Sequence, residues 1–329
     1  MPPLPSSDSE SRDGDDVPRR FRNIHVGNNP GIQRRTDPFQ YENVHVLLFC
    51  WEEDDSAGWG EMRTLAKVFG RDFGYNANCY RIPNYHPYQY IERTLRHFKH
   101  FTLSPNNLLI VYFHGHANFA DRVRLRATAR SYVHQSFLIH PLKLPNRGPD
   151  PWLSNYHQEI DLSGIMISLQ SMGSDVLFLL STCWAGGILS TVEEASAGAL
   201  YLPQDRVEIM ASCGYEATSP PPGPNSFCSA LIEELRSRID SGHNQTFNTA
   251  QLYRGIYHRL LNINLDLPSL PRGPEERKLE PTSPIHISLD DRAERASIPL
   301  KVIRRDVGRN QCWGPQSLFD RYYPVHVYL

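Results

Sequence analysis

The stretch Asp175–Gly187, DVLFLLSTCWAGG, decides how the rest of the chain is interpreted. Its apolar residues run without interruption from Val176 to Leu180, and Cys183 follows after a Ser-Thr pair. A short apolar run with a turn signal behind it is typical of a strand that is buried on both faces, as in a parallel sheet. Cys183 is therefore expected just past a strand, at the carboxyl edge where open α/β folds place their sites.

A second stretch has the same pattern. Leu108–Phe113, LLIVYF, is followed by His114-Gly115-His116-Ala117. If the two strands are parallel neighbours, a histidine and a cysteine leave the sheet at the same edge. These are a base and a nucleophile arranged for covalent catalysis.

The two strand ends together resemble those of the caspase and metacaspase clan of cysteine peptidases. Metacaspase-like proteins end one strand in a Gly-His pair and another in Asp-x-Cys, and the matching stretches here are Tyr112–Ala117 and Ser181–Gly186. His116 lies 67 residues upstream of Cys183, and caspases place their histidine about 50 residues upstream. The resemblance covers about residues 42–300 and is closest to the single-chain caspase-like proteins of fungi.

The resemblance implies a caspase-like (caspase-hemoglobinase) α/β fold, a three-layer α/β/α sandwich around a mostly parallel six-stranded sheet. Residues 1–40 are predicted to be a disordered N-terminal tail, because they are polar and lack aliphatic clusters. Residues 42–302 would form the peptidase domain, and an insertion at 118–160 would add a hairpin and a long loop. Residues 303–329 are left as a C-terminal extension.

The alternation of strand and helix patterns predicts a parallel sheet independently of the resemblance. The predicted strands are Val44–Cys50, Asn78–Ile82, Leu108–Phe113, Asp175–Leu180 and Val207–Ser212. The predicted helices are Glu61–Phe69, Tyr90–Phe101, a segment from an Asp161 N-cap through Leu169, Phe227–Arg238 and Thr249–Leu261. Pro284–Leu289 and Ser297–Val302 are predicted to be a last strand and an edge segment.

The resemblance also assigns roles. Cys183 would be the nucleophile, with its pKa lowered by a nearby histidine and its backbone N–H facing the oxyanion. Alignment on the metacaspase Gly-His makes His116 the base, preceded by Gly115, with Ala117 as an oxyanion donor where a glycine is usual. Alignment on the caspase His-Gly makes His114 the base, and Gly115 then supplies the second oxyanion N–H. We favour His116. The alternative for Cys183 itself is a buried structural cysteine.

Ser181 departs from the metacaspase pattern. Those enzymes carry an aspartate at this position, which contacts a basic P1 side chain, and a serine cannot form that ion pair. The acidic run after the first predicted strand offers Asp54 and Asp55 as replacements at the same edge. The alternatives are a solvated acidic loop or a bound cation such as calcium. No other metal or cofactor is expected.

Composition restricts the partners. The net charge of −2 does not indicate a basic surface that binds nucleic acid. No apolar run approaches the length of a membrane span. The N-terminus has no apolar core of a secretory signal. The cysteines are scattered without paired spacing, which favours reduced thiols in the cytoplasm, with the nucleus as a second option.

Two functions therefore compete. The first is a cysteine-type endopeptidase that cleaves protein or peptide substrates, with basic P1 residues as a candidate preference. The second is a catalytically inactive caspase-like interaction or regulatory module. A nucleotide-binding fold is disfavoured, because neither a G-x-G-x-x-G after the first strand nor a Walker lysine is present.

Overall fold

The computed structural model describes residues 41–53, 56–102, 104, 106–120, 124–128, 159–188, 205–215, 217–241, 246–266, 282–289 and 297–303. All of them belong to one compact unit, Asp37–Leu329. The predicted tail at 1–40, most of the insertion and nearly all of the C-terminal extension lie outside these residues. The predicted domain boundaries therefore stay predictions.

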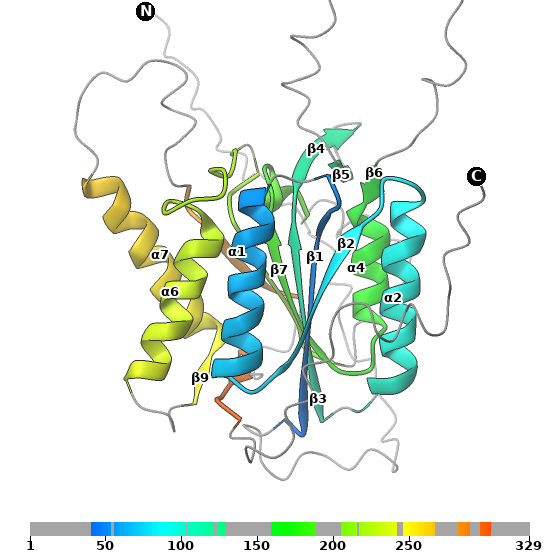
Figure 1. Cartoon of the computed structure of the whole chain (residues 1–329), viewed down its shortest axis with the longest axis horizontal. Coiled ribbons are helices and arrows are strands. Elements are labelled where there is room, and N and C mark those ends of the chain that lie inside the picture. The colour runs from blue at the N-terminus through cyan, green and yellow to red at the C-terminus, as the bar shows by residue number, and fades with distance from the viewer. Residues whose placement is uncertain are drawn as a thin grey trace, which may run out of the picture. The chain divides into compact units, whose positions relative to one another are not determined.

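A mostly parallel six-stranded sheet forms the centre of this unit (Figure 1). Its spatial order is β10 (Ile285–Ser288), β8 (Val207–Ala211), β7 (Asp175–Ser181), β3 (Asn107–His114), β1 (Asn43–Trp51) and β2 (Asn76–Ile82). β10 runs antiparallel to β8, whereas the pairings among the other five strands are parallel. The predicted adjacency of the histidine and cysteine strands is confirmed, because β3 pairs with β7 in the middle of the sheet.

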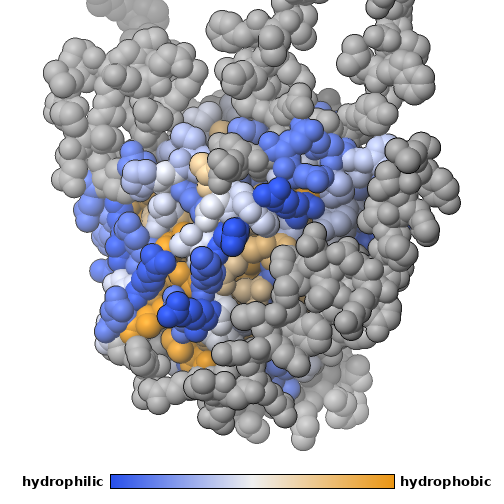
Figure 2. All heavy atoms as spheres, viewed as in Figure 1, coloured by the Kyte–Doolittle hydropathy of each residue, from blue (hydrophilic) through white to orange (hydrophobic). Residues whose placement is uncertain are grey.

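Helices cover both faces of the sheet, which confirms the predicted three-layer sandwich. On one face lie α1 (Ser56–Lys67), α6 (Phe227–Asp240) and α7 (Thr249–Asp266). On the other lie α2 (Pro87–Thr102) and α4 (Leu162–Gln170). Where its atoms are not grey, the view in Figure 2 shows many hydrophilic residues on the side where α1 and α6 lie, as expected of amphipathic helices that bury one face.

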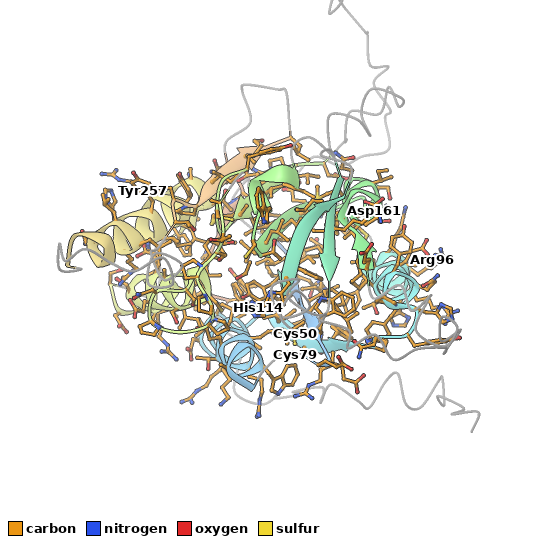
Figure 3. All side chains as sticks on the ribbon, turned by 90° about the horizontal axis from the view of Figure 1, so that it is seen from above. Cys50, Cys79, Arg96, His114, Asp161 and Tyr257 are labelled. Atoms are coloured by element: carbon orange, nitrogen blue, oxygen red, sulfur yellow. The ribbon has the colours of Figure 1, made fainter. Side chains whose placement is uncertain are left out.

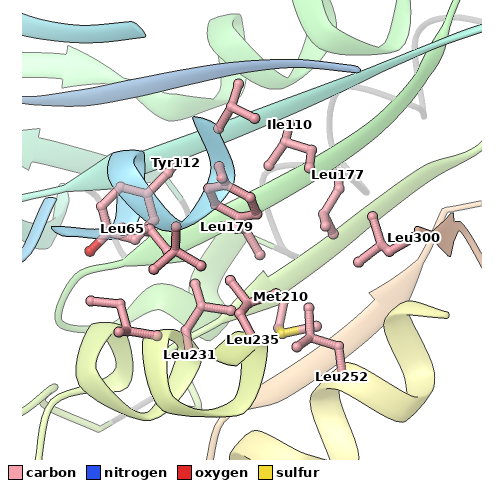
Figure 4. Close-up of a cluster of buried hydrophobic side chains, with 14 of the residues drawn as sticks. Leu65, Ile110, Tyr112, Leu177, Leu179, Met210, Leu231, Leu235, Leu252 and Leu300 are labelled. Carbon is pink, nitrogen blue, oxygen red and sulfur yellow. The ribbon is translucent and has the colours of Figure 1, made fainter. Parts of the chain in front are cut away.

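The core divides into two clusters because side chains alternate along each strand. Ile110 and Tyr112 of β3 point to the α1 face, where they pack with residues of α6 and α7 (Figure 4). Val111 and Phe113 point to the α2 face. β7 is buried along its whole length, as its continuous apolar run predicts.

The elements agree with the predicted ones in type and differ at some ends. α2 begins at Pro87, three residues before the predicted start, because proline is favoured in the first turn of a helix. α1 begins at Ser56, earlier than predicted, and the chain continues from it into the π-helical turn η1 (Val68–Asp72). Asp161 ends β6 and directly precedes α4.

The predicted edge segment is placed differently. β11 (Pro299–Leu300) pairs with β9 (Phe247–Asn248) in a separate two-stranded sheet rather than with the central sheet. The sequence pattern of a strand is the same whether it joins the central sheet or a separate small sheet. Only its long-range pairing partner decides between the two.

The predicted hairpin after β3 is present. β4 (His116–Ala120), β5 (Arg124–Thr128) and β6 (Glu159–Asp161) form a small antiparallel sheet. Its buried residues Leu125 and Ala127 share a core cluster with Ala185 and Ile188, which follow Cys183. The hairpin that starts at His116 therefore packs on the turn that contains the predicted nucleophile.

Candidate active site

The pairing of β3 with β7 brings the two predicted motifs to one edge. The register runs from Leu108 opposite Asp175 to His114 opposite Ser181. His116 and Cys183 each come two residues after this last pair. Both therefore follow the ends of neighbouring strands at the carboxyl edge of the parallel sheet, with His116 at the start of β4 and Cys183 in the turn after β7.

This strand end faces α1. Cys50 lies opposite His114 in the pairing of β1 with β3, and it belongs to the core cluster on the α1 face. Residues opposite each other in a sheet project to the same face, so His114 and its partner Ser181 share that face. Figure 3, which is viewed from above this edge, shows His114 on the α1 side of the sheet. Ser181 is almost fully buried and neighbours the Tyr112 hydroxyl.

Cys183 is half-buried at the start of the turn after β7. Its thiol donates a long hydrogen bond of 3.9 Å to the carbonyl oxygen of Ser219. Burial is the largest influence on this thiol and raises its pKa above the ordinary value. The sequence predicted the opposite direction. The difference arises because desolvation of the thiolate outweighs any stabilisation by its surroundings.

The turn after Cys183 is strained and tightly packed. Trp184 has a left-handed backbone with φ of 59°, which is uncommon for a non-glycine residue, and its N–H donates to the Ala217 carbonyl at 2.8 Å. A Cβ on Gly186 would lie 2.7 Å from the backbone of Gly214 and of Tyr215. Strained backbone that the surrounding structure holds in place is concentrated at functional sites.

The segment after β8 supplies this support. The Ser212 hydroxyl accepts from the Thr182 N–H at 3.2 Å and donates to the Thr182 carbonyl at 2.9 Å. Cys213 is buried, and its thiol donates to the carbonyls of Thr182 (3.3 Å) and Ala217 (3.2 Å). Burial raises the pKa of Cys213 to about 11. These contacts indicate a structural role for Cys213. The supporting roles of Ser212 and Ser219 left no signal in the sequence, because they depend on contacts between distant segments.

The residues from His114 to Ala117 differ in their exposure to solvent. His114 is half-buried, whereas His116 is exposed as the first residue of β4. Ala117 is buried and lies opposite Ala127 in the hairpin. The Gly115 N–H donates to the Ser181 carbonyl at 3.4 Å, so this backbone already has a partner within the protein.

The predicted acidic candidates are only partly visible. Glu52 and Glu53 follow β1 at the same edge and are exposed. Asp54 and Asp55 lie outside the described residues, so their placement relative to Cys183 stays a prediction. Within the described ranges, no group of three or more His, Cys, Asp or Glu side chains is placed to hold a metal ion.

Comparisons with solved structures give distant similarity. The chain is similar to a caspase-1 from Spodoptera frugiperda, with 15% identity over 84% of this chain and 96% of that chain, and a TM-score of 0.49. It is also similar to a protein from Geobacter sulfurreducens, with 9% identity over 80% and 100% of the two chains, and a TM-score of 0.43. No family model and no curated protein matches the sequence.

None of the helices in the described part of the chain is both long and apolar enough to span a bilayer.

Proposed function

We propose that the protein is a cysteine-type endopeptidase of the caspase and metacaspase clan, with Cys183 as nucleophile and His116 as general base. The observation that carries this proposal is the register of β3 with β7, which sends both residues out of the same sheet edge. The turn at Trp184 supports the proposal, because its left-handed backbone and its hydrogen bond to Ala217 fix the backbone next to the nucleophile.

In the proposed reaction, His116 takes the thiol proton as the Cys183 sulfur attacks the carbonyl carbon of the scissile peptide bond. The backbone N–H groups of Cys183 and Ala117 stabilise the resulting oxyanion. His116 then gives the proton to the leaving amine, which departs and leaves a thioester. A water molecule, deprotonated by His116, hydrolyses this thioester and frees the enzyme. Because burial raises the pKa of the Cys183 thiol, we place the proton transfer in the substrate-bound state.

Two observations support His116 over His114 as the base. His116 and Cys183 each follow the end of one of the paired strands by two residues, counted from the pair His114 and Ser181. The alternative also requires the Gly115 N–H as oxyanion donor, and this group already donates to the Ser181 carbonyl. In our proposal Gly115 shapes the loop rather than binding substrate.

The proposed substrates are proteins or peptides, and basic P1 residues are the proposed preference. Ser181 carries no charge, so the acid that meets a P1 arginine would be Asp54 or Asp55. Calcium binding by this acidic run remains the competing proposal for these two residues. The five cysteines in the described ranges are free thiols, which supports a reducing compartment. We propose the cytoplasm, or alternatively the nucleus, with neither nucleic acid nor membrane as a partner.

A catalytically inactive interaction module is the second candidate. Three features favour it: Ser181 in place of the usual aspartate, Ala117 in place of glycine, and the raised pKa of Cys183. A module of this kind would keep the fold and the strained turn without turning over peptides.

Hydrolysis of a peptide library separates the two candidates. The purified wild type is expected to cleave peptides with a time-dependent release of new amino termini, whereas Cys183→Ala should be inactive with an unchanged melting temperature. The matched control is Cys79→Ala, which removes a thiol that is also half-buried but lies on the edge strand β2. If the wild type releases new amino termini no faster than Cys183→Ala, the inactive module is favoured.

A further inference from the structure

We infer that Trp51 is a positioning residue for the catalytic histidine, because its indole packs against Gly115 and so fixes where the chain enters His116. The structural part of this inference concerns the loop itself. The catalytic part rests on the proposed function, in which His116 is the base.

The contact between Trp51 and Gly115 leaves no room for a side chain. A Cβ built on Gly115 would lie 2.8 Å from Cδ1 and 3.0 Å from Nε1 of the Trp51 indole, and 3.5 Å from Cε1 of Phe113. The first distance is shorter than Cβ contacts in real structures. Gly115 is therefore needed here because its α-carbon rests on the edge of an aromatic ring.

Trp51 is itself held firmly. It is the last residue of β1, its side chain is 1% exposed, and it shares a core cluster with Phe113 and Ala117. Its backbone lies opposite Ile82 of β2, and the next residue, Glu52, donates its N–H to the Ile82 carbonyl at 2.9 Å. A large, close-packed side chain on a fixed strand end forms a rigid support for the neighbouring loop.

Trp51 contacts Gly115 from the side of β1, whereas β7, the strand before Cys183, lies on the other side of β3. The Gly115 N–H donates to the Ser181 carbonyl of β7, and the indole of Trp51 comes from β1. The loop is thus held between the two strands that flank β3. One residue later the chain reaches His116, whose position decides whether its imidazole reaches Cys183. Displacement of a catalytic group by about 1 Å costs roughly 100-fold in rate, so the support matters for catalysis.

The first test uses Trp51→Phe, which keeps a buried aromatic ring and removes part of the indole edge. Hydrogen–deuterium exchange of a peptide over residues 112–118 reports on the loop, and kcat and KM on a peptide substrate report on catalysis. We expect faster exchange in this peptide, kcat lowered by about 10- to 100-fold, and KM changed by less than about twofold.

The matched control is Phe49→Leu. Phe49 lies two residues earlier on the same strand, belongs to the same core cluster and is also 1% exposed, but it stacks on Tyr80 rather than on the loop. This variant is expected to lower the melting temperature, while loop exchange and kcat stay at the wild-type values. A loss of kcat in both variants in proportion to their loss of stability would overturn the inference.

A pair of substitutions tests the contact directly. Gly115→Ala should lower kcat, because the new methyl group pushes the loop away from the indole. Trp51→Val removes both ring atoms that the methyl group meets, so the double variant should be less impaired than the product of the two single effects. Strictly multiplicative effects would contradict the inference. If Trp51→Val does not fold, the exchange and kinetic data on Trp51→Phe still decide the question.

The readouts separate this inference from the proposed function. If wild type and Cys183→Ala show the same rate, the proposed function fails, and with it the catalytic part of the inference. Loop exchange in Trp51→Phe then still decides the structural part. If the wild type is active, and Trp51→Phe leaves both exchange and kcat unchanged, the inference fails while the function stands.

Discussion

His114 lies directly opposite Ser181 in the parallel pairing of β3 with β7. This pair ends both strands, and His116 and Cys183 each follow it by two residues, His116 in β4 and Cys183 in the turn after β7. Because β3 and β7 are parallel neighbours in register, their ends lie at the same level, and the two residues that follow leave the sheet at one edge. It is the structural basis for assigning a base and a nucleophile to one site.

The two histidines should differ sharply when they are removed. His116→Ala is expected to lower kcat by about 10²- to 10⁴-fold, the usual contribution of a general base, while His114→Ala should cost less than about tenfold. Steady-state kinetics on one peptide substrate, with melting temperatures as the folding control, measures both. The reverse order of effects would move the catalytic role to His114 and the oxyanion role to Gly115.

The pH dependence of Cys183 reactivity follows from its burial. A raised pKa means that, at any given pH, a smaller fraction of Cys183 is thiolate than in a cysteine with the ordinary pKa of 9.0. Alkylation of Cys183 by iodoacetamide in the free protein should therefore accelerate from neutral pH to beyond that value, measured by mass spectrometry of the peptide containing Cys183. A reaction rate that is already at a plateau from about pH 6 to 8 would instead reveal a preformed thiolate–imidazolium pair.

The central strands are predictable because their physics is local. Continuous apolar runs such as Leu108–Phe113 and Val176–Leu180 bury both faces of a strand, and the strand–helix alternation then requires a parallel sheet. The position of Cys183 after its strand follows from the same pattern. This is why the fold class and the strand ends that make up the site could be predicted from the sequence.

The supports of the site could not be predicted, because they are contacts between distant segments. The N–H of Trp184, which has a left-handed backbone, donates to the Ala217 carbonyl, and the Cys183 thiol donates to the Ser219 carbonyl. The packing of Trp51 on Gly115 joins residues that are 64 positions apart. The predicted direction of the Cys183 pKa shift was also wrong, because the burial that raises this pKa is a property of the folded chain.

Substrate preference depends on the acidic run after β1. An arginine that enters a mostly buried pocket needs a carboxylate, because an unpaired buried charge costs several kcal/mol. Asp54→Ala or Asp55→Ala should therefore raise KM and lower kcat/KM for P1 arginine substrates by about tenfold or more, with little change for neutral P1 residues.

A library of P1 residues measured on wild type and both variants tests this preference. Equal loss for all P1 residues would show that the acids serve the fold or a cation. Restoration of activity by calcium would identify the cation. A wild-type preference for P1 aspartate would contradict the proposed preference outright.

Stability should depend strongly on Glu61 of α1. Its carboxylate accepts hydrogen bonds from the Gly223 N–H at 2.6 Å and from the hydroxyls of Ser226 (2.9 Å) and Ser229 (3.2 Å), at the N-terminus of α6. Glu61→Ala removes these bonds and a negative charge next to a helix N-terminus, and should cost about 1–3 kcal/mol of unfolding free energy.

Glu233→Ala is the control for this prediction. The Glu233 side chain is 60% exposed and lies 3.4 Å from Arg259, so its loss should change stability by less than about 0.5 kcal/mol. Urea unfolding of both variants gives the comparison. Similar values for the two would mean that the Glu61 contacts contribute little to the packing of α1 on α6.

The central claim is that Cys183 is a nucleophile activated at this edge of the sheet. Its most direct measurement is covalent labelling by an electrophilic peptide, an acyloxymethyl ketone with a P1 arginine, followed by intact mass and peptide mapping. We predict one adduct per chain, located on Cys183, absent in Cys183→Ala and formed at least about 100-fold more slowly in His116→Ala. Labelling that is equal in wild type and Cys183→Ala, or that falls on another cysteine, would contradict the account.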